Sequence, residues 1–155
     1  MQPDDPRNPT WTLRITAGAD GPAHAHARGQ RFDVGDPVSF DEAYPHATAL
    51  EHVFAAAGAE LVNGVRALAR ARRLELDAVE ALVQGKLEDA LAQLGVVGAT
   101  GSPAIRSVHV RLYASSTEPE PAVRELLELA QARAPLWQTL QRAGVTLSVE
   151  LKVAP

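Results

Sequence analysis

The side chains of this sequence that could carry out chemistry are carboxylates and histidines, because the chain contains no cysteine. Without a thiol it can form no disulfide, no thiolate–metal bond and no cysteine nucleophile. Glu51, His52 and Glu60 could instead form a group for proton transfer. On an ideal helix Glu51 and Glu60 point about 180° apart, so they could meet only across an interface between two chains. For Glu51 we favour another role, that of a residue capping the start of a helix.

Two histidines form an incomplete metal-binding pattern. His24 and His26 are separated by one residue, so on a strand both rings would point to the same side, as metal ligands often do. No third ligand can be assigned beside them from the sequence. We therefore expect a solvated strand face, with no bound metal and no other cofactor.

The composition is that of one globular domain without a membrane or nucleic-acid partner. The chain has 155 residues, enough for one hydrophobic core, and its net charge of −4 offers no basic surface for nucleic acid. No apolar stretch has the length of a membrane span. Residues 1–9 are polar and rich in proline, with no apolar leader segment. We expect a flexible tail over residues 1–9, a single domain over residues 10–155, and a cytoplasmic location.

The first part of the chain has the alternation typical of strands. Apolar and polar residues alternate over residues 11–17, and the Asp-Gly pair at residues 20–21 predicts a hairpin turn. The segment 23–32 should return as one strand, with both histidines and Arg28 on the same face. Residues 33–45 hold two prolines and four carboxylates, which predicts a connector over the surface.

A long helix follows, and two of its faces are suited to burial. Apolar residues recur at steps of three and four from Leu50 to Leu68. Thr48 and Glu51 have the spacing of a capping box, and arginines lie near the C-terminal end. The opposite face is rich in small residues, namely Ala55, Ala56, Ala59 and Gly64. A helix buried on two sides is typical of the middle of an oligomer, so we expect a homodimer.

The remaining chain combines strands with helices. Alternating patterns predict three strands, over residues 79–87, 107–113 and 145–153. A loop over residues 94–103 contains three glycines, whose spacing differs from that of a phosphate loop. A helix should follow Thr117, and Pro135 should end it and begin a short third helix that Gly144 closes. This order predicts an α+β fold with antiparallel sheets.

The order of elements and two short stretches resemble the OsmC/Ohr family. Residues 50–57 (LEHVFAAA) are similar to the start of that family's central helix, where an alanine-rich turn leads to the peroxide-reactive cysteine. Residues 134–140 (APLWQTL) are similar to the Cys-Pro element that carries its resolving cysteine. The resemblance extends from Phe32 to Val153. It implies antiparallel sheets packed on a long central helix, in an intertwined dimer.

The chain departs from this family at the residues that perform its chemistry. The reactive cysteine falls on Leu61, or on Glu60 if the register shifts by one, and the resolving cysteine falls on Ala134. The family's arginine is also missing from the first hairpin loop, residues 17–23. Because only a low-pKa thiolate attacks the peroxide oxygen, we exclude hydroperoxide reduction by the family mechanism. Residues 58–64 (GAELVNG) resemble a branch of the family without this cysteine.

The resemblance implies a vestigial pocket around the lost cysteines, in which we assign no catalytic residue. Its candidate residues are Glu51, His52, Glu60, Leu61, Asn63, Ala134 and Trp137. Asn63 could bond a ligand or a partner helix, and Trp137 could wall the pocket or belong to the core.

Three functions remain open for such a protein. Loss of a polar thiol makes the pocket more apolar, so the leading hypothesis is a non-catalytic dimer of this stress-related family that binds a small apolar ligand. The second is an enzyme that uses the carboxylate and histidine candidates for acid–base chemistry. The third is a purely structural or interaction protein.

Glu60 is the residue on which these hypotheses differ most. It stands in the middle of the helix among apolar neighbours, so its carboxylate must reach solvent, pair with a cation or give up its charge. We expect Glu60 to be buried and paired, with Arg66 or with an arginine of the partner chain.

Overall fold

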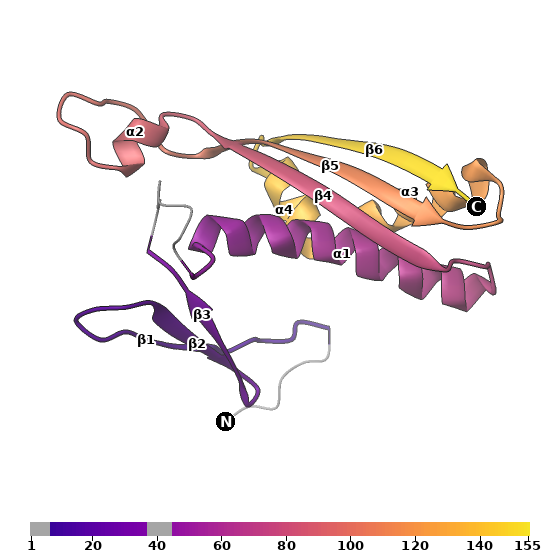
Figure 1. Cartoon of the computed structure of the whole chain (residues 1–155), viewed down its shortest axis with the longest axis horizontal. Helices are drawn as coiled ribbons and strands as arrows, with labels where there is room; N and C mark the ends of the chain where they lie inside the picture. The colour runs from indigo at the N-terminus through magenta and orange to yellow at the C-terminus, as the bar shows by residue number, and fades with distance from the viewer. Residues whose placement is uncertain (1–6, 37–44) are drawn as a thin grey trace. The chain divides into compact units, whose positions relative to one another are not determined.

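The computed structural model describes residues 7–36 and 45–155 (Figure 1). The chain divides into two compact units, Met1–His52 and Val53–Pro155. Most of the expected N-terminal tail lies outside the described residues. Within the described ranges, no helix is long and apolar enough to cross a membrane.

The first unit contains a small antiparallel sheet of strand order β1-β2-β3. Its strands are β1 (Arg14–Thr16), β2 (Ala23–Ala27) and β3 (Gln30–Val34). The turn between β1 and β2 contains the predicted Asp-Gly pair, and Gly21 has a φ of 87° there. This left-handed conformation suits glycine, which confirms the first hairpin.

A second hairpin follows directly, and it corrects two predictions. The single strand expected over residues 23–32 is wrong, because the chain turns back at Arg28 and Gly29. These residues have φ values of 47° and 80°, the left-handed pair of a two-residue hairpin turn. Arginine seldom adopts this conformation, so the pair is a weak turn signal and Arg28 lies off the histidine face. Asp33 belongs to β3 rather than to the predicted connector, of which residues 37–44 lie outside the described part.

The long helix α1 (Ala49–Arg72) begins at the predicted cap. The Thr48 N–H donates to the Glu51 carboxylate at 2.7 Å, and the Glu51 N–H donates to the Thr48 hydroxyl at 3.3 Å, which confirms the capping box. Arg73, with a φ of 59°, ends the helix. One face of α1 is buried, through Ala57, Gly58, Leu61, Val65 and Ala69.

The second unit contains a three-stranded sheet of order β4-β5-β6. Its strands are β4 (Ala78–Leu87), β5 (Ile105–Ser115) and β6 (Thr146–Ala154). The α+β class is confirmed, but the β5–β6 pair is parallel, which corrects the predicted antiparallel arrangement. A parallel pair needs a crossover connection, and α3 (Glu120–Arg133) with α4 (Pro135–Arg142) supplies it.

The long connection between β4 and β5 holds the predicted glycine-rich loop and a short helix, α2 (Ala90–Gln93), that was not predicted. Asp89, just before α2, accepts a hydrogen bond from the Ser102 N–H at 3.1 Å. A Cβ on Gly101 would overlap the Asp89 carboxylate, so this glycine lets the two sides of the loop approach.

The helices α1, α3 and α4 lie on one side of this sheet (Figure 1). Two glycines bring α1 close to β4: a Cβ on Gly58 would lie 2.6 Å from Val83, and one on Gly85 would overlap the ring of Phe54. The largest fully buried side chains are Leu61, Val65, Val108, Val110, Leu112, Val123 and Leu126. The core of the second unit therefore lies between the sheet and its helices.

Candidate functional site

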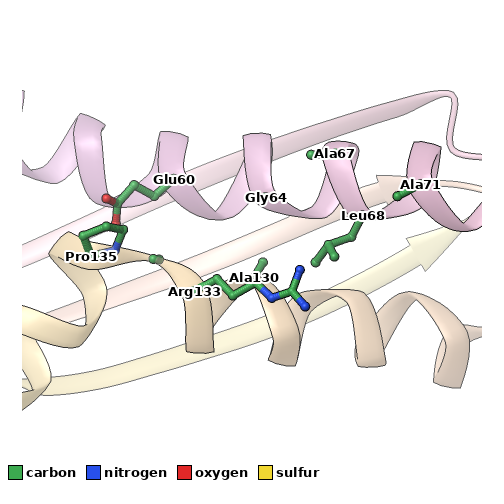
Figure 2. Close-up of a pocket in the computed structure, with 9 residues that line it drawn as sticks. Glu60, Gly64, Ala67, Leu68, Ala71, Ala130, Arg133 and Pro135 are labelled. Atoms are coloured by element: carbon green, nitrogen blue, oxygen red, sulfur yellow. The ribbon is translucent and has the colours of Figure 1, made fainter. Parts of the chain in front are cut away.

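The carboxylate of Glu60, on α1, binds the first turn of α4 (Figure 2). It accepts hydrogen bonds from the Leu136 N–H at 3.0 and 3.1 Å and from the Trp137 N–H at 3.2 Å. Ala134 precedes this helix and forms no side-chain cap. The first N–H groups of a helix have no partner within it and carry a partial positive charge. Glu60 therefore caps α4 from a different helix.

This contact gives Glu60 a partner other than Arg66, whereas pairing with an arginine of the partner chain stays a prediction. Among the described residues Glu60 forms no ion pair with Arg66 or with another cation, and its side chain is half-buried rather than buried. Backbone N–H groups at a helix start neutralise a carboxylate as a cation would. Local sequence could not predict this partner, because α4 follows α1 only after β4 and β5.

A pocket of about 400 Å³ adjoins this contact, between α1 and the α3–α4 corner (Figure 2). Its residues are Glu60, Gly64, Ala67, Leu68, Ala71, Ala130, Arg133, Ala134 and Pro135. Most of them are small and apolar. The helices come close at Gly64, where an added Cβ would lie 2.9 Å from the Ala130 Cβ. Short side chains on both helices thus leave a space with an apolar lining.

Two charged groups border this pocket, and their environments differ. Glu60 is bound to the α4 backbone. Arg133, in the last turn of α3, is exposed and forms neither an ion pair nor a side-chain hydrogen bond within the described chain. Arg133 was not among the predicted site residues. The only sequence signal for it was its position, directly before the Ala134-Pro135 pair.

The predicted site residues of the second unit separate into three groups. Glu60 and Ala134 line the pocket. Leu61 is fully buried, and Trp137 is 3% exposed; both belong to the core and lie outside the pocket lining. Asn63 is exposed on α1 and does not border the pocket. Of the two possible positions for the lost reactive cysteine, Glu60 is the one that adjoins Ala134.

Glu51 and His52 lie in the first turn of α1, where both side chains bond Thr48. Hydrogen bonds from the backbone and hydroxyl of Thr48 lower the pKa of the Glu51 carboxyl below its ordinary value. The His52 Nδ1 donates to the Thr48 carbonyl at 2.9 Å, and the ring of Phe32 lies 5.5 Å from its ring. Both side chains therefore stabilise the start of the helix.

His24 pairs with a carboxylate that we had assigned to the connector. Its Nδ1 lies 2.7 Å from Asp33, with Arg31 at 3.6 Å and His46 at 3.9 Å from the same carboxylate. The hydrogen bond from His24 lowers the pKa of Asp33. Within residues 7–36 and 45–155, no group of three or more His, Cys, Asp or Glu side chains could hold a metal ion. The geometry is that of a half-exposed ion-pair cluster on β2 and β3.

Comparisons with known proteins agree with this architecture. Solved structures of OsmC-like proteins from Mycoplasma pneumoniae and Vibrio cholerae match with TM-scores of 0.79 and 0.73 at 13% and 10% sequence identity. The first match covers 95% of this chain and 99% of the other; the second covers 93% and 99%. The organic hydroperoxide resistance protein OhrB of Bacillus subtilis matches with a TM-score of 0.59 at 18% identity, over 92% of this chain and 98% of its own.

At such low identity these structures support the fold alone. No curated protein sequence matches the chain. The family model described as OsmC-like protein matches residues 42–150, which is most of the sequence. The chain therefore belongs to the OsmC-like protein family.

Proposed function

We propose that this protein is a homodimer without thiol-peroxidase activity that binds a small apolar ligand in the pocket between α1 and α3. The observation that carries the proposal is the lining of this pocket. It includes Ala134, matched to the resolving cysteine, and Glu60, the position of the reactive cysteine if the register shifts by one from Leu61. Beside them lies the apolar wall formed by Ala67, Leu68 and Ala130. A volume of about 400 Å³ with a mostly apolar lining is typical of small-molecule sites.

The chemistry available at these positions supports a binding role. Met1 carries the only sulfur of the chain, and a thioether cannot cycle as a thiol. The Glu60 carboxylate accepts hydrogen bonds from two backbone N–H groups, so it has a structural role as the cap of α4. A general base must reach its substrate proton, and these bonds hold the Glu60 carboxylate against the start of α4. The acid–base alternative therefore has less support than ligand binding.

The exposed face of α1 supports the homodimer. Three alanines in the middle of this helix, together with Asn63, are exposed on the side away from the core, at Ala55, Ala56 and Ala59. Small residues let two helix backbones approach closely. Arg66 and Arg70 follow toward the C-terminal end. An antiparallel pair of α1 helices would keep these arginines away from their counterparts, so we propose that arrangement.

The small sheet of the first unit also supports association. Among its described residues Ala25 is the only buried apolar side chain. Among the described residues of the first unit, the exposed large apolar side chains are Ile15, at 59%, in β1, Phe32, at 40%, in β3, and Trp11, at 71%, and Leu13, at 49%, just before β1. A three-stranded sheet needs an apolar layer on one face to be stable. In the proposed dimer the partner chain would supply that layer.

Native mass spectrometry of the purified protein would test ligand binding. We expect the wild type to retain or take up a small apolar molecule, and Ala71→Phe to lose it because the ring would fill the pocket. Ala132→Phe is the matched control, since Ala132 is an exposed alanine of α3 outside the pocket lining. Equal binding by all three proteins, or none by the wild type across a panel of apolar compounds, would overturn the proposal.

The absence of native cysteine makes disulfide trapping a clean test of the dimer. The double variant Ala59→Cys/Asn63→Cys should form covalent dimers on mild oxidation, because antiparallel α1 helices would bring the two positions together. A single cysteine at Ala132, on α3, should not. Light scattering of the wild type at micromolar concentration should give twice the chain mass. A monomer there would contradict the dimer.

A further inference from the structure

The proposed function leaves the chemical class of the ligand open, and the charges around the pocket narrow it. Resting on that proposed function, we infer that the ligand is an amphipathic monocarboxylate. Its head group pairs with Arg133, and its tail lies along the apolar wall formed by α1 and α3.

Within the described residues, Arg133 lacks an acidic partner of the kind that Arg72 and Arg124 have. Arg72 pairs with Glu125 at 2.8 Å, and Arg124 pairs with Glu120 one turn earlier on α3. Arg133 borders the pocket and has no such partner among the described residues. Figure 2 shows its side chain extending past Ala130 toward Leu68. A guanidinium beside an apolar space is suited to bind a carboxylate through two parallel N–H···O bonds.

The other charged group of the pocket, Glu60, forms no ion pair with Arg133 within the described residues. Glu60 is the only carboxylate in the lining, and α4 already supplies its hydrogen bonds. The protein therefore leaves one positive charge of the pocket without a counterion. A single negative charge on the ligand balances it, whereas a second negative charge would meet repulsion from Glu60. This balance favours a monoanionic head group over a doubly charged phosphate.

The remaining lining determines the tail. Gly64, Ala67, Leu68, Ala71 and Ala130 present only hydrogen or carbon beyond their backbones. They offer no side-chain donor or acceptor, so a polar tail would lose its hydrogen bonds to water without replacement. The volume of about 400 Å³ is near the lower end of ligand pockets, which suits a chain of medium length.

Arg133 has an alternative explanation that the experiment must separate. A cation in the last turn of a helix stabilises the helix dipole without any ligand. Arg142 occupies the same place in α4, is also exposed and unpaired within the described residues, and lies outside the pocket. Substitution of Arg142 therefore reproduces the loss of charge and dipole stabilisation while leaving the pocket intact.

Titration calorimetry with octanoate, 1-octanol and octyl phosphate on the full chain would test the inference. We expect octanoate to bind the wild type about tenfold more tightly than 1-octanol, the gain of one charge-assisted interaction. The doubly charged octyl phosphate should bind more weakly than octanoate. Arg133→Gln should remove the preference for octanoate and leave 1-octanol binding unchanged. Arg142→Gln should keep the preference for octanoate. Arg133→Lys should show a preference between those of the wild type and Arg133→Gln, because a lysine cannot form two parallel N–H···O bonds to a carboxylate.

The outcomes separate this inference from the function on which it rests. Equal affinity of the wild type for octanoate and 1-octanol would overturn the carboxylate and leave apolar binding intact. Equal loss of the preference for octanoate in Arg133→Gln and Arg142→Gln would also overturn the inference, because the net charge of the protein would then explain the preference. Tighter binding of octyl phosphate would overturn the monoanionic head group. Failure of all three compounds, with an empty pocket in native mass spectrometry, would overturn the proposed function itself.

Discussion

Replacement of Glu60 tests the fold most directly, because its carboxylate, on α1, accepts the hydrogen bonds of the first turn of α4. We expect Glu60→Ala to lower the free energy of unfolding by about 1–3 kcal/mol and Glu60→Gln by about 0.5–1.5 kcal/mol. Alanine removes both the acceptor and the charge. Glutamine keeps one carbonyl oxygen and loses the charge that faces the helix dipole.

The structure supports these magnitudes. Glu60 accepts from the Leu136 and Trp137 N–H groups, and Ala134 provides no local substitute. Loss of an N-cap side chain costs about 0.5–2 kcal/mol, and the charge near a helix start contributes about 0.3–1 kcal/mol. Because Glu60 is half-buried, water can reach the freed N–H groups, which keeps the alanine cost below that of a fully buried orphan.

Denaturant midpoints at matched protein concentration would measure the effect, with helix content followed by circular dichroism. Glu128→Gln is the control, because Glu128 is exposed on α3 and has no ion pair among the described residues. We expect a change within about 0.5 kcal/mol. Ala134 has the extended backbone of a cap residue, with a φ of −86° and a ψ of 109°. Ala134→Ser should therefore recover about 0.5–1 kcal/mol in the Glu60→Ala background and less in the wild type.

The reasoning would be refuted if both Glu60 variants matched the Glu128→Gln control. It would also fail if Ala134→Ser had the same effect in both backgrounds, because the two side chains would then not serve the same N–H groups.

Three further predictions follow from separate parts of the molecule. Gly85→Ala should destabilise the fold by about 1–3 kcal/mol through overlap with the Phe54 ring, and Phe54→Leu in the same chain should recover part of that loss in denaturant unfolding. Hydrogen bonds from Arg111 and Lys152 hold the pKa of Glu150 at about 2, below its ordinary value of 4.5. The stabilising effect of the Glu150 charge should be complete above pH 4.5 and disappear as the pH falls toward 2. Glu150→Gln should therefore make the melting temperature depend less on pH over that interval. A steeper acid transition in this variant would contradict the assignment. Metal-free protein should reduce neither hydrogen peroxide nor organic hydroperoxides in coupled assays with dithiols, because the chain has no thiol, and turnover above the buffer rate would contradict this.

Local pattern predicted the elements whose signals lie within one stretch of chain. The capping box at Thr48 and Glu51 is a three-residue spacing, and the structure forms both of its hydrogen bonds. The start of α4 at Pro135 and the left-handed Gly144 after it follow from backbone restrictions of single residues. The turn at Arg28 was not predicted, because its conformation is uncommon for arginine and the local turn signal is therefore weak.

Pairings between distant segments could not be predicted in this way. The parallel pairing of β5 with β6 depends on where the α3–α4 crossover returns the chain. The partner of Glu60 depends on which helix begins next to the middle of α1 in the folded chain. From the sequence alone, a carboxylate among apolar helix residues indicates only that it needs a hydrogen-bond partner. Arg133 borders the pocket only because Gly64 lets α3 approach α1 there.

The sequence by itself determined the class of fold, the long central helix and the exclusion of thiol chemistry, because composition and periodicity are properties of the chain alone. Tertiary structure decided which residues form the pocket and which are core. Leu61 and Glu60 are neighbours in sequence, yet about 100° of helical rotation places one in the core and the other at the start of α4. That difference depends on what packs against each face of the helix, and those neighbours lie far along the chain.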